Sequence, residues 1–530
     1  MNSLVILFIS IAFFIFGYKI YAGKIEALFD LDPKRPTPAL SKFDSVDFVP
    51  AKNWFVLFGH HFASIAGAGP IIGPIIAVIV WGWLPALLWI LIGTVFIGAV
   101  HDFSALMVSV REGGVSIAEV SEAAISKYAR VIFSVFLWLT LILVIAVFLY
   151  FCAKTFVSEP RIVLPSLGLI PVAILIGFLL YRLKLHIVSS TLIGLVLLIG
   201  LIVAGNIFPI VLAGNAIITW SIILLFYCLV ASVLPVNILL QPRDYLCGYL
   251  LFFGLAVGFL GLFIEHPAMN IPAFITWDTK MGPLWPFVFI TVACGAVSGF
   301  HSLIASGTTS KQLASERDAR KIGYGAMVTE GLVAVFAILA VNAGMKAGNL
   351  ATAIKDPIGA FGTGFGVLTN KFLFGLGSFI AITVLNAFIL TTLDTATRIG
   401  RYVTQELFGI KNRYIATIIV IVPCAILALS GEWTRIWPAF ATANQLTAAL
   451  ALIVICCYLL ARKKNITMFL IPTVFMFLTA FVALLYQLKR FSSIEERDPI
   501  LFCVSLILII LSGFMVFEGS RAILKIKKAN

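Results

Sequence analysis

Charged residues are scarce in this sequence. Only 12% of the 530 residues are Asp, Glu, Lys or Arg, whereas 61% are hydrophobic. Soluble domains contain about 25% charged and about 45–50% apolar residues, so an ordinary soluble protein is excluded. No long hydrophilic segment interrupts the apolar runs, which argues against a separate soluble domain. The composition therefore predicts an all-α polytopic protein that is embedded in a lipid bilayer.

Several motifs of enzyme and metal chemistry are also missing. The eight cysteines include no C-x-x-C pair, which argues against a metal knuckle or a disulfide framework. No H-E-x-x-H occurs, and the glycine-rich stretch 359–366 lacks the Gly-Lys-Ser/Thr ending of a phosphate-binding loop. We interpret that stretch as a mobile external loop or a re-entrant lid. No enzyme and no cofactor are expected, apart from a coupling ion.

Apolar runs and their flanking charges predict about fifteen transmembrane helices. They form an N-terminal extra helix (1–22), a central core (23–430) that includes the spans 54–79 and 285–305, and a set of C-terminal helices (431–530). The predicted spans are 3–21, 54–79, 84–110, 131–153, 163–182, 186–204, 217–240, 246–264, 285–305, 322–343, 372–393, 413–430, 437–461, 466–486 and 499–518.

The net charge of +13 follows from the distribution of Lys and Arg among the loops. If the N-terminus lies outside, most of these residues fall in cytoplasmic loops and in the C-terminal tail. No basic residue precedes Lys19, so the charged region of a signal peptide is absent as well. We therefore predict an external N-terminus, a cytoplasmic C-terminus and attraction to anionic lipid rather than to nucleic acid. The oligomeric state is not predicted.

The stretch Phe58–Pro74 is unusual for a segment that crosses a bilayer. It contains two histidines, a serine, four glycines and the helix-breaking prolines Pro70 and Pro74. The backbone groups freed by such breaks are tolerated only where protein or a watery cavity surrounds them. The stretch therefore predicts a discontinuous helix that lines a transport site.

A second stretch, Gly299–Gly307, shares the pattern G-x-H-x-x-x-x-x-G with Gly59–Gly67. The two stretches lie seven predicted helices apart and so would cross the membrane in opposite directions. Matched, glycine-interrupted helices of opposite direction indicate an inverted repeat around a substrate site. We expect the backbone at Gly67–Pro70 and Ser302–Gly307 to hold the substrate, although small residues also allow close helix packing. The predicted substrate-binding residues are His61, Ser64, Gly67, Ala68, Gly69, Pro70, His301, Ser302, Ser306 and Gly307.

Ionisable residues inside apolar runs are candidates for coupling to a proton or a cation. Asp102 lies within a span, where it either forms an ion pair that locks helices or takes part in coupling. Asp394 shares a helix face with threonines and with Arg398, so an Asp394–Arg398 pair is the structural alternative. Isolated polar residues such as Glu330 are more often contacts between helices. The predicted coupling residues are His60, Asp102, Thr391, Thr392, Asp394 and Thr395; no metal is assigned.

The sequence resembles the carbon starvation protein A family of bacterial inner-membrane transporters. The resemblance is carried by Leu57–Pro70 with Gly73-Pro74, Gly98–Phe103, Ser298–Lys311, Thr391–Thr395 and Trp437–Leu446. It implies import of small peptides or pyruvate during carbon starvation, with H⁺ or Na⁺ coupling. It also implies a core like that of the amino acid/polyamine/cation (LeuT-like) transporters, in which the first and sixth core helices are broken. His101 departs from the expected Gln.

Two other functions are less compatible with the sequence. An intramembrane hydrolase would need Ser306 and His301 to face each other, but residues five apart on one helix do not. A starvation sensor without flux would need a signalling domain, which the sequence lacks.

Overall fold

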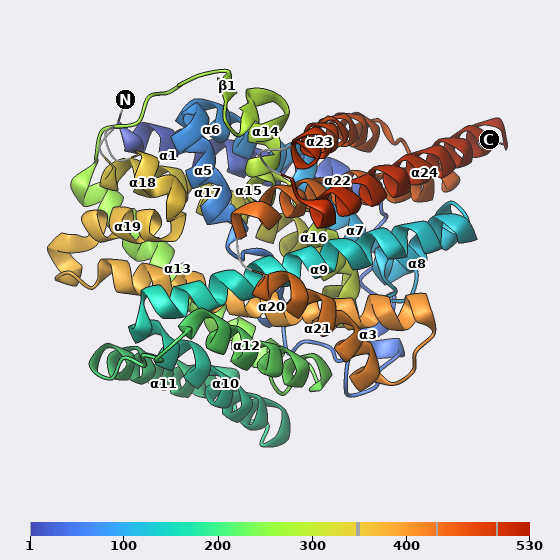
Figure 1. The fold of residues 1–530 in the computed structure, drawn as a ribbon. Coiled ribbons are helices and arrows are strands. Elements are labelled where there is room, and N and C mark those ends of the chain that lie inside the picture. Colours follow the sequence, from blue (N-terminus) through green and yellow to red (C-terminus); the bar gives the residue numbers. More distant parts are fainter. Residues whose placement is uncertain (1, 346–349, 431–432, 494–496, 530) are drawn as a thin grey trace.

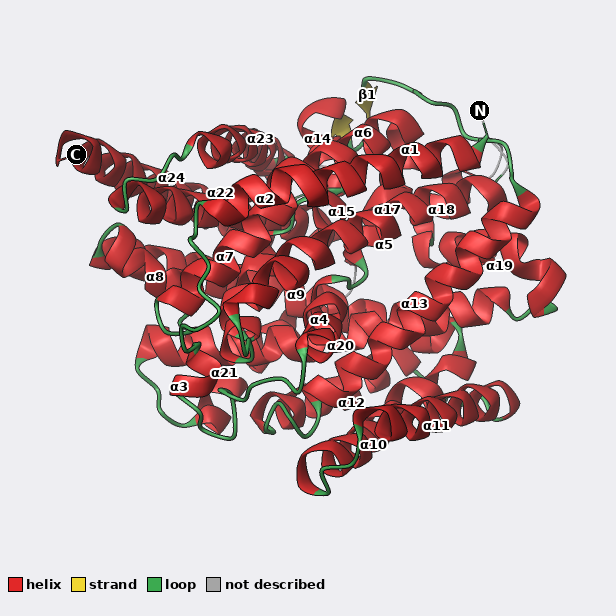
Figure 2. Ribbon diagram, turned by 180° about the vertical axis from the view of Figure 1, so that it is seen from behind, coloured by secondary structure: helices red, strands yellow, loops and turns green. Residues whose placement is uncertain are grey.

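The computed structural model describes residues 2–345, 350–430, 433–493 and 497–529, and these are almost entirely helical (Figures 1 and 2). The first half of the chain forms α1 (Ser3–Phe16), α2 (Ala22–Ala27), α3 (Pro38–Ser41), α4 (Trp54–Ile65), α5 (Gly69–Trp81), α6 (Trp83–Gly93), α7 (Ala99–Arg111), α8 (Ile117–Ala124), α9 (Lys127–Ser158), α10 (Val163–Gly177), α11 (Ile187–Ile207), α12 (Ala216–Val233) and α13 (Leu240–Glu265).

The second half begins with a short antiparallel hairpin and continues with helices. Its elements are β1 (Asp278–Thr279), β2 (Gly282–Pro283), α14 (Leu284–Thr291), α15 (Ala293–Ala296), α16 (Gly299–Gly307), α17 (Gly325–Gly344), α18 (Leu350–Lys355), α19 (Pro357–Leu373), α20 (Gly377–Phe408), α21 (Arg413–Leu429), α22 (Trp433–Ala461), α23 (Thr467–Ser492) and α24 (Pro499–Ala529).

Short π-helical segments join or extend several of these helices. They are Gly17–Tyr21 after α1, Thr94–Gly98 between α6 and α7, Phe178–Arg182 after α10 and Arg320–Tyr324 before α17. The 3₁₀ turns are Pro160–Ile162, Thr309–Lys311 and Glu316–Asp318.

Within the described residues, twelve helices are long and apolar enough to cross a membrane, or thirteen if the bent pair α4–α5 forms one span. Every predicted apolar run falls on a helix or on a series of helices. The count of about fifteen complete spans is nevertheless not confirmed. α21 is shorter than a typical span, and the predicted run 285–305 is divided into α14, α15 and α16.

The glycine-rich stretch 359–366 is helical, so the mobile-loop alternative is wrong, and the re-entrant lid stays a prediction. It lies in α19, which packs between α17 and α20. A Cβ added at Gly364 would lie only 2.1 Å from the carbonyl oxygen of Ala340, so glycine allows α19 to approach α17 closely. The glycines here serve helix packing.

Burial separates a core from peripheral helices. For each long helix we compare the most apolar window of 18 residues. In α20 and in α22, 94% of this window is buried, but only 22% is buried in α11 and 28% in α24. Figure 1 shows α10 and α11 along one edge and α23 and α24 along the opposite one, with α16 and α20 between them, and Figure 2 shows α4 in the same middle region. The peripheral helices therefore present apolar faces suited to lipid, and the polar residues concentrate in the core.

Candidate functional site

The first predicted break is confirmed. α4 ends at Ile65, α5 begins at Gly69, and the two helices are bent by 42°. At the break, the backbone N–H of Gly67 donates to the carbonyl of Ile65 (2.9 Å) instead of continuing the helix. All residues from Val56 to Ile79 are buried, so protein surrounds the break, as a bilayer segment requires.

Two threonine hydroxyls of α20 satisfy carbonyls beside this break. Thr391 Oγ1 donates to the carbonyl of Ala63 at 2.9 Å, and Thr392 Oγ1 donates to that of Ser64 at 3.1 Å. In addition, Ser64 Oγ lies 3.3 Å from Thr395 Oγ1. The predicted coupling face of α20 is thus in direct contact with the first broken helix.

The second break lies at Val297–Ser298, between α15 and α16. Val297 is extended (φ −153°, ψ 110°), and Asn444 of α22 caps the start of α16. Its Oδ1 accepts from the backbone N–H of Phe300 at 2.8 Å and from the Ser298 hydroxyl at 3.2 Å. The expectation of open backbone at Ser302–Gly307 is therefore corrected, because those residues belong to the regular helix α16.

The two G-x-H motifs do not occupy equivalent positions. His61 precedes the first break, whereas His301 follows the second, so the pattern does not align the two breaks. The helices themselves pair in opposite directions: α4 packs against α16, and α5 packs against α14 and α15. The match of the two motifs is therefore not evidence of an inverted repeat, although the two broken helices lie side by side.

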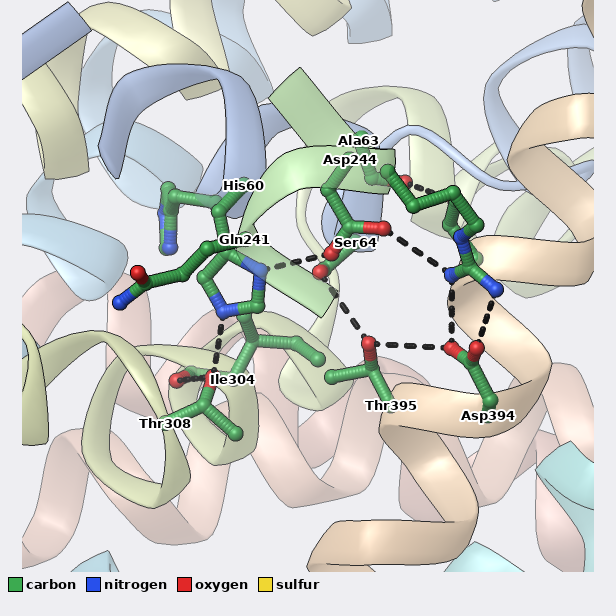
Figure 3. A network of polar contacts seen from close by, with 12 residues as sticks. His60, Ala63, Ser64, Gln241, Asp244, Ile304, Thr308, Asp394 and Thr395 are labelled. Atoms are coloured by element: carbon green, nitrogen blue, oxygen red, sulfur yellow. Dashed lines mark hydrogen bonds and ion pairs between the residues drawn. The ribbon is translucent and has the colours of Figure 1, made fainter. Parts of the chain in front are cut away.

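A buried ionic network connects α4, α13 and α20 (Figure 3). Arg243 of α13 forms an ion pair with Asp394, in which Nη2 lies 2.9 Å from Oδ1, and it also contacts Asp244 at 3.0 Å. Asp244 in turn lies 2.6 Å from Nδ1 of His60. Tyr227 of α12 donates to Asp394 Oδ2 at 2.6 Å. Asp394 thus sits in one continuous network with His60.

The structure corrects the partner of Asp394. The alternative pair Asp394–Arg398 is wrong, because Arg398 forms an ion pair with Asp47 (2.9 Å) in the segment before α4. The sequence prediction omits Arg243 and Asp244, because residues 241–245 fall between two predicted spans. Their signal was a charge pair directly next to an apolar run, and α13 extends over them.

A second buried cluster surrounds Asp102 of α7. Asp102 Oδ1 lies 2.8 Å from His101 Nδ1, and Oδ2 lies 2.9 Å from His301 Nδ1. The opposite nitrogen of His301, Nε2, lies 3.3 Å from Oε2 of Glu330 in α17. The sequence predicts Asp102 as a coupling residue and His301 as a substrate-binding residue, and the structure places the two side chains in contact.

The remaining predicted residues are held mainly by packing and by helix hydrogen bonds. His61 Nδ1 lies 2.8 Å from Thr309 Oγ1. The hydroxyls of Ser302 and Ser306 donate to carbonyls of α16 itself.

The small residues around the breaks are enclosed by close packing. A Cβ added at Gly69 would lie 2.2 Å from Cys294 Cβ, and a Cβ added at Gly67 would lie 2.7 Å from Thr392 Oγ1. Gly307 packs against Ile399 in the same way, and Ala68 and Pro70 are fully enclosed.

A cavity of about 190 Å³ opens beside the second broken helix. Its wall includes Thr291 at the end of α14, Gln487 of α23 and the basic residues Lys280 and Arg490. Gln487 donates to the carbonyl of Pro438 (2.9 Å) and to Thr442 Oγ1 (2.6 Å). The cavity therefore combines positive charge with polar groups close to the broken helix.

The fold has a counterpart among solved structures. A manganese transporter from Eremococcus coleocola, in complex with an aromatic bis-isothiourea compound, matches with a TM-score of 0.55 at 15% identity over 93% of this chain and 100% of that chain. A mutant of the same transporter matches with a TM-score of 0.53. At this identity the likeness shows the fold alone. With twelve or more helices long and apolar enough to cross a membrane, the described residues define a multi-pass membrane protein.

Sequence relatives specify the family. The pyruvate/proton symporter BtsT of Escherichia coli is 31% identical over 95% of this chain and 84% of its own length. The peptide transporters CstA of Campylobacter jejuni and Bacillus subtilis are 31% and 30% identical over 94% and 90% of this chain. The model of the family "Carbon starvation protein CstA" matches residues 2–364 and 345–483. This chain belongs to that family.

Proposed function

We propose that this protein is a proton-coupled secondary transporter that imports pyruvate or small peptides across the bacterial inner membrane during carbon starvation. Substrate binds between the two broken helices, and alternating access occurs around them. The proposal draws on the family membership and on the names of relatives, which include a pyruvate/proton symporter and peptide transporters.

One observation carries the proposal: the buried network that runs from the first broken helix to Asp394. Arg243, Asp244 and Asp394 have side chains that are at most 1% exposed. Charges buried in a membrane protein are costly, and they mark ion or proton pathways more often than stabilising contacts. Because these side chains come from α13 and α20 and reach His60 in α4, a change of protonation here acts directly on the broken helix.

The same geometry favours a proton over Na⁺ as the coupling ion. Na⁺ would need several free oxygen ligands. The carbonyls of Ala63 and Ser64 already accept threonine hydroxyls, and Asp394 already accepts from Arg243 and Tyr227. A carboxylate in such a network can instead gain or lose a proton without a vacant coordination shell.

We also propose that the protein has a LeuT-like core and about fifteen membrane crossings. In this arrangement α4–α5 and α14–α16 take the places of the first and sixth core helices, and α20 takes that of the eighth. The antiparallel packing of the broken helices against each other supports it. This assignment remains a fold-level analogy.

Uptake into proteoliposomes tests the function. Purified protein is reconstituted, and labelled pyruvate and dialanine are offered under a pH gradient or a Na⁺ gradient alone. We expect accumulation of at least one substrate under the pH gradient, with no added effect of Na⁺. Accumulation that depends on neither gradient would overturn the symport mechanism, and dependence on Na⁺ alone would overturn proton coupling. Hydrolysis of dialanine would support the hydrolase alternative.

A further inference from the structure

We propose that Glu330 of α17 carries the coupling proton and exchanges it with Asp102 through the imidazole of His301. The proposal rests on proton coupling in the proposed function and adds a residue and a route to it. It concerns the second buried cluster, which is separate from the Asp394 network.

The three side chains form a continuous line across three elements. Asp102 Oδ2 contacts His301 Nδ1 at 2.9 Å, and His301 Nε2 lies 3.3 Å from Glu330 Oε2. The three side chains are at most 1% exposed. His301 lies in the first turn of α16, directly after the second break, so any movement of this half-helix changes both distances.

The possible positions of the protons show why this arrangement is suited to proton transfer. A neutral imidazole has a single N–H, so it can donate to only one of the two carboxyl groups. In one state Glu330 is a neutral acid that donates to Nε2, while Nδ1–H donates to Asp102. In the other state Asp102 is the neutral acid and Nε2–H donates to Glu330. Both states contain the same number of protons and hydrogen bonds.

Interconversion of these states moves one proton. The O–H bond of Glu330 breaks as an N–H bond forms at Nε2, and the N–H bond at Nδ1 breaks as an O–H bond forms at Asp102. Glu330 becomes a carboxylate, Asp102 becomes an acid, and His301 changes tautomer without a net gain of charge. No oxidant, metal or further reactant is required.

Several buried polar atoms at the Glu330 end and around the three side chains lack hydrogen-bond partners among the described residues. In the described parts of the chain, neither carboxyl oxygen of Glu330 has a hydrogen bond of normal geometry, and Nε2 of His101 and Nε2 of His61 have none either. A purely structural buried ion pair would be expected to satisfy these atoms. Unsatisfied acceptors next to a proton donor are what a relay needs between its two states.

Other titratable groups surround the line and belong to its electrostatics. They are His61 of α4, His101 of α7 and Cys294 of α15, which interact with His301, Asp102 and Glu330 respectively. His101 contacts the second oxygen of Asp102 at 2.8 Å, so it can stabilise either protonation state of that carboxyl group.

Two measurements on full-length protein in proteoliposomes separate a relay from a structural contact. The first is proton uptake, followed with an internal pH dye, when external pyruvate or dialanine is added, whichever the wild type accumulates. The second is counterflow of the same substrate at equal pH, which needs no net proton movement. The variants are Glu330→Gln and Glu330→Asp, and Glu265→Gln is the matched control because Glu265 pairs with Lys371 outside the core.

For Glu330→Gln we expect proton-driven accumulation to fall at least 10-fold while counterflow stays within about twofold of wild type. Glu330→Asp should retain part of the accumulation, and Glu265→Gln should behave as wild type. Normal accumulation and proton uptake in Glu330→Gln would overturn the relay.

If Glu330→Gln loses counterflow as well, Asp102→Asn decides. The relay requires the same split between accumulation and counterflow in that variant, and loss of both activities there too would overturn it. A wild type that takes up substrate without protons would contradict the proposed function itself. Failure of the relay gives a different result. In that case the wild type and the Glu330→Gln variant both couple substrate uptake to protons normally.

Discussion

Arg243 joins two carboxylates from different helices although its own side chain is only 1% exposed. Charges in such a setting lose their hydration, and their mutual attraction has to offset that loss. Removal of one partner leaves the other charge uncompensated, at a cost of about 3–5 kcal/mol. The Asp394–Arg243 pair is therefore a point where folding and coupling can be separated by experiment.

We expect Asp394→Asn to abolish proton-driven uptake and to lower thermal stability in detergent, because Arg243 keeps only Asp244 as an anionic partner. The double variant Arg243→Gln/Asp394→Asn should regain much of the stability but no coupled uptake. Tyr227→Phe, which removes one donor to Asp394, is the control and should cost only about 1 kcal/mol. Coupled uptake at the wild-type rate in Asp394→Asn would show that this carboxylate is not needed for coupling.

Asp47 gives a pH-dependent contribution outside the membrane spans. Burial raises the pKa of this carboxyl group, but the positive charges of Arg398, Arg401 and Lys311 and a hydrogen bond from Tyr402 outweigh it and lower the pKa to about 2. A carboxyl group whose pKa is lowered on folding stabilises the fold above its unfolded pKa of 3.8. That contribution is lost as the pH falls through about 2.

Asp47→Asn should therefore destabilise the protein by roughly 2 kcal/mol at pH 7. The difference from wild type should persist down to about pH 4 and shrink between about pH 4 and about pH 2. Thermal unfolding of both proteins in acid-stable detergent, measured across this pH range, tests the sign. A difference that grows on acidification would contradict it.

At the scale of elements, glycines set the distance between the broken helices. A Cβ added at Gly73 of α5 would lie 2.2 Å from the carbonyl oxygen of Thr291, at the end of α14. That contact is with backbone, so no side-chain rotation can relieve it. Gly200 of α11 is the matched control, because no atom of the described residues lies within 4 Å of its added Cβ.

Gly73→Ala should push α5 away from α14, lower stability by about 1–3 kcal/mol and reduce transport. Gly200→Ala should leave transport unchanged and stabilise its helix by up to about 1 kcal/mol. Thermal unfolding in detergent and uptake assays on both variants provide the comparison. Equal behaviour of the two would mean that α5 and α14 are not in close contact.

Elements also show where prediction from sequence succeeds and where it stops. The first break was predictable, because Gly67 and Gly69-Pro70 weaken a helix by their own chemistry, whereas Gly73-Pro74 lies inside the continuous helix α5. The break at Val297–Ser298 has no proline, and it is completed by Asn444 from a helix far along the chain. Such a cap is a tertiary contact, and a single sequence does not indicate it.

The same limit applies to the candidate site. Asp102, His301, Asp394 and the α20 threonines were predictable, because polar residues in apolar runs are rare and conspicuous. Their partners were not, since the pairing of Asp394 with Arg243 depends on how α13 and α20 pack. At the level of the whole chain, composition alone was sufficient for the class, an all-helical membrane protein.

The arrangement of the whole molecule leads to a prediction about topology. In both Figure 1 and Figure 2, the N-terminus and the C-terminus lie at opposite ends of the long direction followed by α9 and α20. Opposite sides of the membrane require an odd number of crossings. Thirteen crossings satisfy this, and so do fifteen if both α21 and the α14–α16 series cross.

Epitope tags on the full-length protein, one ahead of Asn2 and one after Asn530, test this in spheroplasts. The excess of Lys and Arg in the predicted cytoplasmic loops places the N-terminal tag outside and the C-terminal tag inside. We expect an antibody to reach the first tag in intact spheroplasts and the second only after permeabilisation.

A third tag at Gly409, between α20 and α21, should be protected like the C-terminal one, because both lie on the side predicted to be cytoplasmic. If both terminal tags are accessible from one side, the number of crossings is even, because only an even number of spans returns the chain to the side where it began, and both thirteen and fifteen crossings are contradicted.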